Sequence, residues 1–423
     1  MTSVRPAAPL LLESQRWPRE RLDSWVEERL EALLAHSRTA PFWRDRVPAN
    51  ATLSDLPLLE REDLQRSLEA MRPPGRRVVT TATTSGSSGR PVTIERGPEA
   101  IRYAAAARLR QLSWWGLPPA ELATANALTT VSAADPPVRQ VSQDPPRFVV
   151  NAFRLGDAVS AAGHGAIVDA GGVALIGATT SVLEQWADAY TRSDQDAGEL
   201  GTELAIVGGE ITAPSQRQRI GAVFGCRTAE MYGAVEAVMI AAECPEGSLH
   251  LNEEVVHVEI LNRDGTEAGA GDLGEVVVTP LHSHDLPLLR YRLGDAAAVL
   301  PGECACGLTL RRLDVQLGRL EDMLIHPDGS LMHPRCVQTA LERVLATPMR
   351  AFHAVQVAPS RFVVYLDVER RDSLRALEEG VAAELGSFMR APVSVELVLD
   401  EARARATLNG GKRRTFSRQM ERR

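Results

Sequence analysis

The stretch TTSGSSGRP at residues 83–91 combines hydroxyl groups, glycines and one cation in a single short segment. Gly86 and Gly89 let the backbone approach a ligand closely, and clustered amides and hydroxyls can surround an anion. Arg90 adds a fixed positive charge suited to oxyanions. These features predict a phosphate-binding loop, formed by Thr84, Ser85, Gly86, Ser87, Ser88, Gly89 and Arg90. A flexible solvated linker has a similar composition, and the nucleotide-binding pattern GxxxxGK[ST] is absent here.

Four further residues have the types that hold a zinc ion. Cys244 and His250 lie in ECPEGSLH, and Cys304 and Cys306 lie in GECACG. Three thiolates and one imidazole are a common ligand set for tetrahedral Zn²⁺, and four protein ligands leave no open position for catalysis. We therefore expect a structural zinc centre. The alternative is four unrelated residues, with the thiols buried as small apolar groups.

Five other residues stand in unusual strings: MYGAVE at 231–236, PLLRYRLGD at 287–295, GRLED at 318–322 and LNGGKRR at 408–414. Tyr232 can stack on a base, and the Glu236 carboxylate can hold Mg²⁺. Asp295 can accept hydrogen bonds from two ribose hydroxyls, or it caps a turn. Arg319 can reach a ribose or a phosphate, and Lys412 can neutralise charge between a carboxylate and an α-phosphate. Taken singly, each is also consistent with ordinary packing or a solvated surface charge.

The chain around these residues alternates between strands and helices. Strands are expected at 77–81, in GVALIGA (172–178) and in ELAIVGGE (203–210), and a helix is expected in TSVLEQWADAY (180–190). This alternation predicts α/β layers, in which ligands bind at the C-terminal ends of the strands. From about 250 to 300 the apolar pattern changes to that of a β region.

The last block of the chain, 319–423, contains expected strands in RFVVYLDV and VSVELVLD and a helix near 372–388. It predicts a small α+β domain behind a linker at 314–322, so that the domains are 1–318 and 319–423. Near the other end, residues 20–37 are expected to form a helix with one apolar face. A chain of 423 residues is long enough for two domains.

Composition narrows the function classes. The formal net charge is −8, so nucleic acid is not an expected partner. No apolar run reaches the roughly 20 residues that cross a bilayer, and the N-terminal residues do not resemble a signal peptide. We expect a cytoplasmic protein without membrane contact, with its five cysteines reduced or bound to metal.

The four strings follow the Ser/Gly loop in one order along the chain. In this order they resemble the motifs of adenylate-forming enzymes, the superfamily of acyl-CoA ligases and adenylation domains. Within it the chain is most similar to the phenylacetate-CoA ligase family, because LLAHSRTAPFWRDRV and LSDLPLLEREDLQ resemble its helical leader. The resemblance implies an α/β fold, with a large N-terminal domain that binds ATP and an acid, and a small mobile α+β C-terminal domain.

The resemblance also implies roles for single residues. Lys412, Glu236 and Arg319 are expected to be catalytic, with Glu236 holding Mg²⁺. Glu321 takes the hinge position, where the family usually has Asp. Besides the loop at 84–90, the ATP site would comprise Gly208, Gly209, Glu210, Tyr232, Gly233, Asp295 and Arg319. The acid pocket would comprise Phe153, Gly177, Thr179, Gly209, Tyr232 and Gly233, with core packing as the alternative for Phe153.

The implied reaction is the ATP-dependent adenylation of an acid, followed by transfer of the acyl group to CoA. The resemblance favours an aryl acid of the benzoate, hydroxybenzoate, aminobenzoate or phenylacetate type, and high Ala and Arg content hints at a GC-rich bacterium and secondary metabolism. After the hinge the family usually reads like RGVNVFP, whereas this chain reads IHPDGSLMHP at 325–334. This departure leaves an amine or a carrier-protein thiol open as the acceptor. A non-catalytic nucleotide-binding relative is a further alternative, and the oligomeric state, a homodimer included, stays open.

Overall fold

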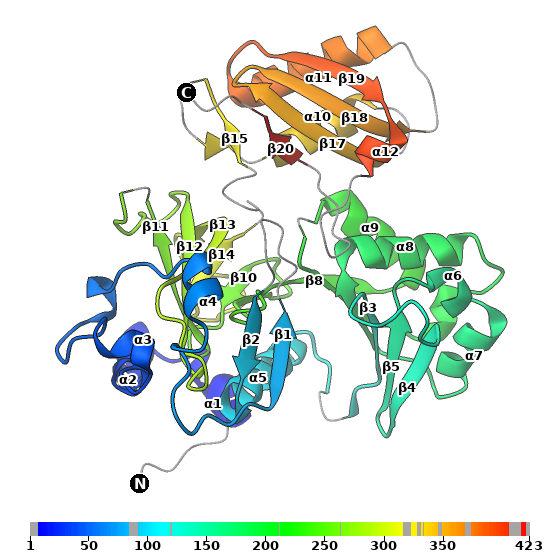
Figure 1. The fold of residues 1–423 in the computed structure, drawn as a ribbon. Coiled ribbons are helices and arrows are strands. Elements are labelled where there is room, and N and C mark those ends of the chain that lie inside the picture. The colour runs from blue at the N-terminus through cyan, green and yellow to red at the C-terminus, as the bar shows by residue number, and fades with distance from the viewer. Residues whose placement is uncertain are drawn as a thin grey trace. The chain divides into compact units, whose positions relative to one another are not determined.

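The computed structural model describes residues 7–83, 92–118, 121–210, 212–262, 264–315, 323–327, 331–332, 334–345, 349–368, 374–405 and 416–419. The chain divides into two compact units, Met1–Leu293 with Ala297–Gln316, and Gly294–Ala296 with Leu317–Arg423 (Figure 1). The predicted boundary between residues 318 and 319 lies outside the described residues and stays a prediction. None of the helices in the described stretches combines the length and apolar character needed to cross a membrane.

A twelve-stranded sheet is the frame of the larger unit, in the order β11-β12-β13-β14-β10-β9-β8-β7-β6-β3-β5-β4. Its strands are β3 (Thr124–Leu128), β4 (Val138–Gln143), β5 (Pro146–Asn151), β6 (Leu175–Thr179), β7 (Leu204–Gly208), β8 (Arg227–Tyr232), β9 (Ala241–Glu243), β10 (Leu249–Leu251), β11 (Val256–Leu261), β12 (Gly274–Pro280), β13 (Tyr291–Leu300) and β14 (Arg312–Asp314). The block β5-β3-β6-β7-β8 is parallel. It contains the two strands predicted in 172–178 and 203–210, and β11–β13 confirm the β region expected from about 250 to 300.

Register across the parallel block creates two rows of residues on one face of the sheet, because side chains two positions apart share a face. The inner row consists of Asn126, Gly177, Ile206 and Ala229. The edge row, two residues nearer the C-terminal ends of the strands, consists of Thr179, Gly208 and Met231. Two of these seven positions, Gly177 of β6 and Gly208 of β7, carry no side chain.

Helices cover the opposite face of the parallel block. They are α6 (Leu155–Ala158), α7 (Ala161–Val168), α8 (Thr180–Thr191) and α9 (Pro214–Phe224). Ile176 and Val207 point to this side and join a buried cluster with Trp186 of α8 and Phe224 of α9, whose ring centroids are 5.4 Å apart. A 3₁₀ turn, η3 (Ala197–Leu200), leads into β7. The helix predicted at 180–190 is therefore confirmed.

Helix α5 (Pro98–Trp114) packs on the face that carries the two rows. Leu112 and Trp115 form a buried cluster with Leu175, Leu204 and Ile206 of the strands. A proline in its first turn and an alanine-rich middle favour this helix, which is not among the predicted elements. It follows a hairpin of β1 (Thr80–Thr83) and β2 (Thr93–Arg96). The strand predicted at 77–81 therefore begins three residues later than expected.

The N-terminal helices are α1 (Ala7–Ser14), α2 (Arg19–Ser37), α3 (Pro41–Arg44) and α4 (Arg61–Ser67), with a 3₁₀ turn η1 (Leu53–Asp55). Helix α2 confirms the prediction for 20–37 and buries Leu22, Val26 and Leu33. Because its opposite side is charged, it lies on the surface with its apolar face inward.

The smaller unit is an α+β fold. A four-stranded sheet has the order β19-β18-β17-β20. The elements are β15 (Leu324–Ile325), β16 (Leu331–Met332), α10 (Arg335–Val344), β17 (Met349–Ala358), β18 (Arg361–Val368), α11 (Leu374–Met389), β19 (Ser394–Leu399), α12 (Glu401–Ala404) and β20 (Phe416–Arg418). Phe362 and Val364 of β18 pack with Val381 and Leu385 of α11. The expected strands and helix of this block are confirmed, and so is the fold class.

Candidate active site and metal centre

The C-terminal ends of β6, β7 and β8 gather several of the predicted ligand-binding residues. Gly208 ends β7, and Tyr232 ends β8 and precedes Gly233. Thr179 ends β6 and is the N-cap residue of α8. Parallel strands that end at one edge of a sheet present their following loops to the same ligand. The structure therefore brings these predicted residues to one edge.

Glycine is required at this edge because backbone segments approach closely. A Cβ on Gly208 would lie 2.4 Å from the Met231 carbonyl oxygen, and one on Gly233 would lie 1.9 Å from the Val238 carbonyl oxygen. Gly209 has a φ of +75°, a conformation that favours glycine. At these three glycines the edge presents backbone, beside the side chains of Thr179 and Tyr232.

Glu210 has a local structural role besides its predicted place in the ATP site. One carboxylate oxygen accepts a hydrogen bond from the Ser181 amide at 2.7 Å, and the other accepts one from Ser181 Oγ at 2.9 Å. A negative charge in this position stabilises the N-terminus of α8. The carboxylate thus fixes α8 to the loop after β7, and its predicted role toward ATP stays a prediction.

Glu236 lies in a tight turn after β8. The Tyr291 hydroxyl donates to Glu236 Oε1 at 3.1 Å, and Arg96 donates to the neighbouring Val235 carbonyl oxygen. Burial lowers the pKa of Arg96, and the nearby Glu236 charge opposes that shift. Within the described chain, Oε2 of Glu236 has no hydrogen-bond partner, so this half-buried carboxylate can offer an oxygen to a cation.

Asp295 and Phe153 occupy other strands and turns. Asp295 is half-buried in β13, directly after Gly294, whose φ is +75°. Phe153 follows β5 and is 57% exposed, so core packing, the alternative for this residue, is wrong. Its place in an acid pocket stays a prediction.

Several predicted residues lie outside the described part of the chain: the loop 84–90, Arg319, Glu321 and Lys412. The flanks of the loop are described, because Thr83 and Thr93 pair across the antiparallel strands β1 and β2. The roles predicted for all of these residues stay predictions.

The four predicted zinc ligands come together from two loops and one strand. Cys244 follows β9, His250 lies in β10, and Cys304 and Cys306 lie between β13 and β14. The Cys244 and Cys304 sulfurs are 3.9 Å apart, and Cys306 Sγ is 3.2 Å from His250 Nε2. All four ligand atoms lie within 4.8 Å of one another. Tetrahedral zinc, with Zn–S near ~2.3 Å and Zn–N near ~2.0 Å, would hold neighbouring ligand atoms roughly 3.5–3.8 Å apart.

Hydrogen bonds prepare this cluster for a metal. His250 Nδ1 lies 3.0 Å from the Leu310 carbonyl oxygen, which can only accept, so Nδ1 carries the proton and Nε2 faces the sulfurs with its lone pair. Metal-binding histidines commonly have this arrangement. Burial also lowers the pKa of His250 and so favours the neutral ring. Turns close on both loops, with Gly247 donating to the Cys244 carbonyl oxygen and Gly307 to that of Cys304.

Two polar residues near the edge were not predicted. Arg108 of α5 and Asn126 of β3 both approach Gly177, where an added Cβ would lie 3.8 Å from Arg108 Nη2 and 2.8 Å from Asn126 Oδ1. The available signal was an arginine on the apolar side of an alanine-rich helix, but the helix itself was not predicted.

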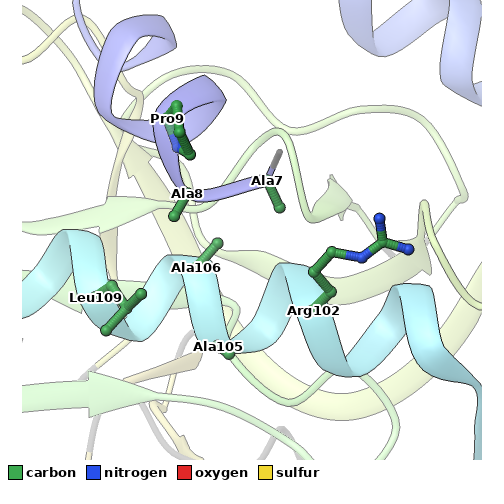
Figure 2. Close-up of a pocket in the computed structure, with 7 residues that line it drawn as sticks. All are labelled: Ala7, Ala8, Pro9, Arg102, Ala105, Ala106 and Leu109. Atoms are coloured by element: carbon green, nitrogen blue, oxygen red, sulfur yellow. The ribbon is translucent and has the colours of Figure 1, made fainter. Parts of the chain in front are cut away.

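A separate hollow of about 470 Å³ lies between α1 and α5. It is lined by the residues that Figure 2 draws as sticks, namely Ala7, Ala8, Pro9, Arg102, Ala105, Ala106 and Leu109. Arg102 is the one charged group among them, and no predicted site residue belongs to this lining. The hollow therefore adds nothing to the candidate active site.

Sequence comparison finds phenylacetate-coenzyme A ligases, although no family model matches. The chain is 25% identical over 367 residues to the enzyme of Thermus thermophilus, covering 78% of this chain and 77% of that protein. It is 33% identical to the enzyme of Escherichia coli over 135 residues, which are 31% of this chain and 30% of that protein.

Structure comparison gives the same class of fold. The crystal structure of 2-hydroxyisobutyryl-CoA ligase in the postadenylation state matches with a TM-score of 0.76 and 18% identity, over 100% of this chain and 94% of that chain. Anthranilate CoA ligase in complex with anthranoyl-AMP matches with a TM-score of 0.54 and 16% identity, over 79% of this chain and 66% of that one. The chain is therefore phenylacetate-CoA ligase-like in sequence, and its fold is that of adenylate-forming ligases.

Proposed function

We propose that the protein is an ATP- and Mg²⁺-dependent acid–CoA ligase that forms an acyl-adenylate and then an acyl-CoA thioester. One observation carries this proposal: the strand-end residues of the superfamily motifs, Gly208, Tyr232, Gly233 and Glu236, lie together at one edge of the parallel block. Sequence relatives named phenylacetate-coenzyme A ligase support the same activity.

In the first step a carboxylate oxygen of the acid attacks the α-phosphorus of ATP, and pyrophosphate leaves with the electron pair of the broken P–O bond. Catalysis then consists of positioning and charge stabilisation. The strand-end backbone at Gly208 and Gly209 would hold the adenine, and Tyr232 would stack on it. Glu236 would hold Mg²⁺, and Lys412 would neutralise charge on the α-phosphate. The loop 84–90, Asp295 and Arg319 would bind the remaining phosphates and the ribose.

An aryl acid is the substrate class that we propose. The named substrates of the relatives support it in part, because phenylacetate and anthranilate are aryl acids, whereas 2-hydroxyisobutyrate is aliphatic. The backbone at Gly209 and Gly233 suits a planar ring, and the exposed ring of Phe153 can provide one wall.

CoA is the acceptor that we propose for the second step, with an amine or a carrier-protein thiol as the other candidates. The sequence IHPDGSLMHP after the hinge, which departs from the family pattern, is the observation that keeps the other acceptors open. The test is pyrophosphate release from ATP and Mg²⁺ across benzoic and phenylacetic acids, with and without CoA. Acceleration by CoA and an acyl-CoA product are expected. Pyrophosphate release that ignores CoA and responds to an amine would overturn the choice of acceptor.

We further propose that Cys244, His250, Cys304 and Cys306 bind one structural zinc ion. The donor set fits Zn²⁺, because three sulfurs and a neutral imidazole nitrogen converge at separations close to those of a tetrahedral site. The ion would connect the loop after β9 with the loop before β14 and would take no part in the reaction, since four protein ligands leave no open position.

A further inference from the structure

Arg108 is a cation on the inner side of α5 that faces the parallel block. Its Nη1 donates to Gln111 Oε1 at 3.1 Å, and Gln111 in turn donates to the Glu230 carbonyl oxygen. No carboxylate among the described residues pairs with Arg108. Burial lowers the pKa of Arg108 to about 10. The guanidinium is thus held in a fixed place with donors to spare.

Asn126 adds a second polar group at the same place. It stands beside Gly177 in the inner row, and its Oδ1 would be 2.8 Å from a Cβ on that glycine. Its side-chain amide makes no hydrogen bond with the described residues. Arg108 Nη2 would lie 3.8 Å from the same Cβ. Two polar side chains from different elements therefore approach the backbone of one glycine, and they form no hydrogen bond with each other.

The position of Arg108 and Asn126 along the strands indicates which part of a bound acid they would contact. The inner row lies two residues below the edge row, which is ~6.6 Å along a strand. An acid whose reacting carboxylate lies at the strand ends would extend its far end toward the inner row. Substituted rings and short dicarboxylic chains have about this reach. A half-buried cation without a carboxylate partner among the described residues carries a desolvation cost, and an oxygen acceptor on the far end of the acid would relieve that cost.

We propose that Arg108 and Asn126 form a subsite that selects an acid with an oxygen acceptor, a carboxylate or a phenolic oxygen, at the end remote from the reacting carboxyl group. Arg108 donates to this oxygen from its fixed fork, which suits a carboxylate. Asn126 donates or accepts according to the group bound. This inference rests on the proposed acid site and goes beyond it by naming the substituent that the site requires.

The test uses the full-length protein and three matched pairs of acids: benzoate with 4-carboxybenzoate, 4-methylbenzoate with 4-hydroxybenzoate, and hexanoate with adipate. Affinity is measured by calorimetry without ATP, and turnover by pyrophosphate release. The variants are Arg108→Met, which removes the charge, and Arg108→Lys, which keeps it. Arg102→Met, an exposed arginine of the same helix, is the control.

In at least one pair the wild type should bind the oxygen-bearing member about tenfold or more tighter, as expected for a hydrogen bond to a charged group. Arg108→Met should abolish that preference without weakening the apolar partner acid, Arg108→Lys should retain part of it, and Arg102→Met all of it. Equal weakening of every acid by Arg108→Met, or a wild-type preference for the apolar members, would overturn the subsite. Failure to bind any of the acids would also overturn it. Selective binding without pyrophosphate release would instead overturn the proposed adenylation and leave the subsite standing.

Discussion

The cysteine–histidine cluster and the strand-end site contrast in how they are built. Four side chains of the cluster converge within 4.8 Å, and hydrogen bonds already fix the tautomer of His250. At the strand ends, Gly208 and Gly233 present backbone, and Glu210 accepts two hydrogen bonds from Ser181 at the N-terminus of α8. In the cluster, protein side chains supply all four ligands for a metal ion. The strand-end site, formed by Gly208, Tyr232 and Gly233, would instead bind ATP and an acid, which are themselves charged. One region should therefore govern stability and the other turnover.

Removing a zinc ligand should have the largest effect, and it should fall on stability. Cys244→Ala leaves three ligands, so the ion should be lost and the free energy of unfolding should fall by about 4 kcal/mol, the linkage expected from a ligand present at a thousand times its Kd. Zinc content and urea unfolding measure this. Cys226→Ala, a partly buried thiol outside the cluster, should keep its zinc. Less than about a tenth of an equivalent of zinc in wild-type protein purified without chelator would reject the site.

Lys412→Ala should show the reverse pattern. Loss of one preorganised charge contact costs on the order of 3 kcal/mol in the transition state, or ~100-fold or more in adenylation rate. The unfolding temperature should stay unchanged. Acid-dependent pyrophosphate exchange gives the rate, and Arg413→Ala, the neighbouring cation, is the matched control. Wild-type exchange by Lys412→Ala would exclude the proposed role.

Glu236→Gln should have a smaller effect that depends on metal concentration. The amide oxygen can still accept from the Tyr291 hydroxyl, but it is a weaker ligand for Mg²⁺ than a carboxylate. We expect about tenfold lower turnover at limiting Mg²⁺, as for the loss of ~1.4 kcal/mol of transition-state stabilisation, with partial recovery at high Mg²⁺. A Mg²⁺ titration of pyrophosphate release tests this. The same half-saturating Mg²⁺ concentration in both proteins would argue against a metal at Glu236.

A dependence of stability on pH should come from His282. Burial lowers its pKa from 6.5 to about 3, so below pH 6.5 the unfolded chain gains a proton that the folded chain does not. The contribution of His282 to the free energy of unfolding should therefore stay nearly constant above pH 6.5 and fall as the pH decreases from 6.5 toward 3. At pH 5 the loss is about 2 kcal/mol.

His282→Gln can still donate to the Glu254 carbonyl oxygen, which His282 contacts at 2.8 Å, but it does not titrate. Urea unfolding at pH 8 and pH 5 should show a smaller acid loss in this variant. A residual slope should remain from His257, whose pKa burial lowers to about 4. Equal losses in both proteins would contradict the account of His282.

The same contrast explains what could be predicted from sequence. The cysteines and His250 stand out because two short segments carry residue types that share one chemical use. The strand-end glycines could be predicted because each comes directly after an apolar run that forms a strand. The α/β fold and the edge of its sheet could therefore be predicted as well. Arg108 and Asn126 were not, because they belong to different elements that meet only through the packing of α5 on β3 and β6. The hydrogen bonds of Glu210 to Ser181 could not be predicted either, because they depend on how the loop after β7 packs against α8.

The central claim is that the strand-end site adenylates an acid. The most direct measurement is the exchange of labelled pyrophosphate into ATP by the zinc-loaded, full-length protein with Mg²⁺, with and without each acid of the panel. The account predicts exchange that requires both an acid and Mg²⁺ and that needs no CoA. Folded protein that binds ATP yet shows no exchange with any acid would contradict the claim and favour a non-catalytic nucleotide-binding role.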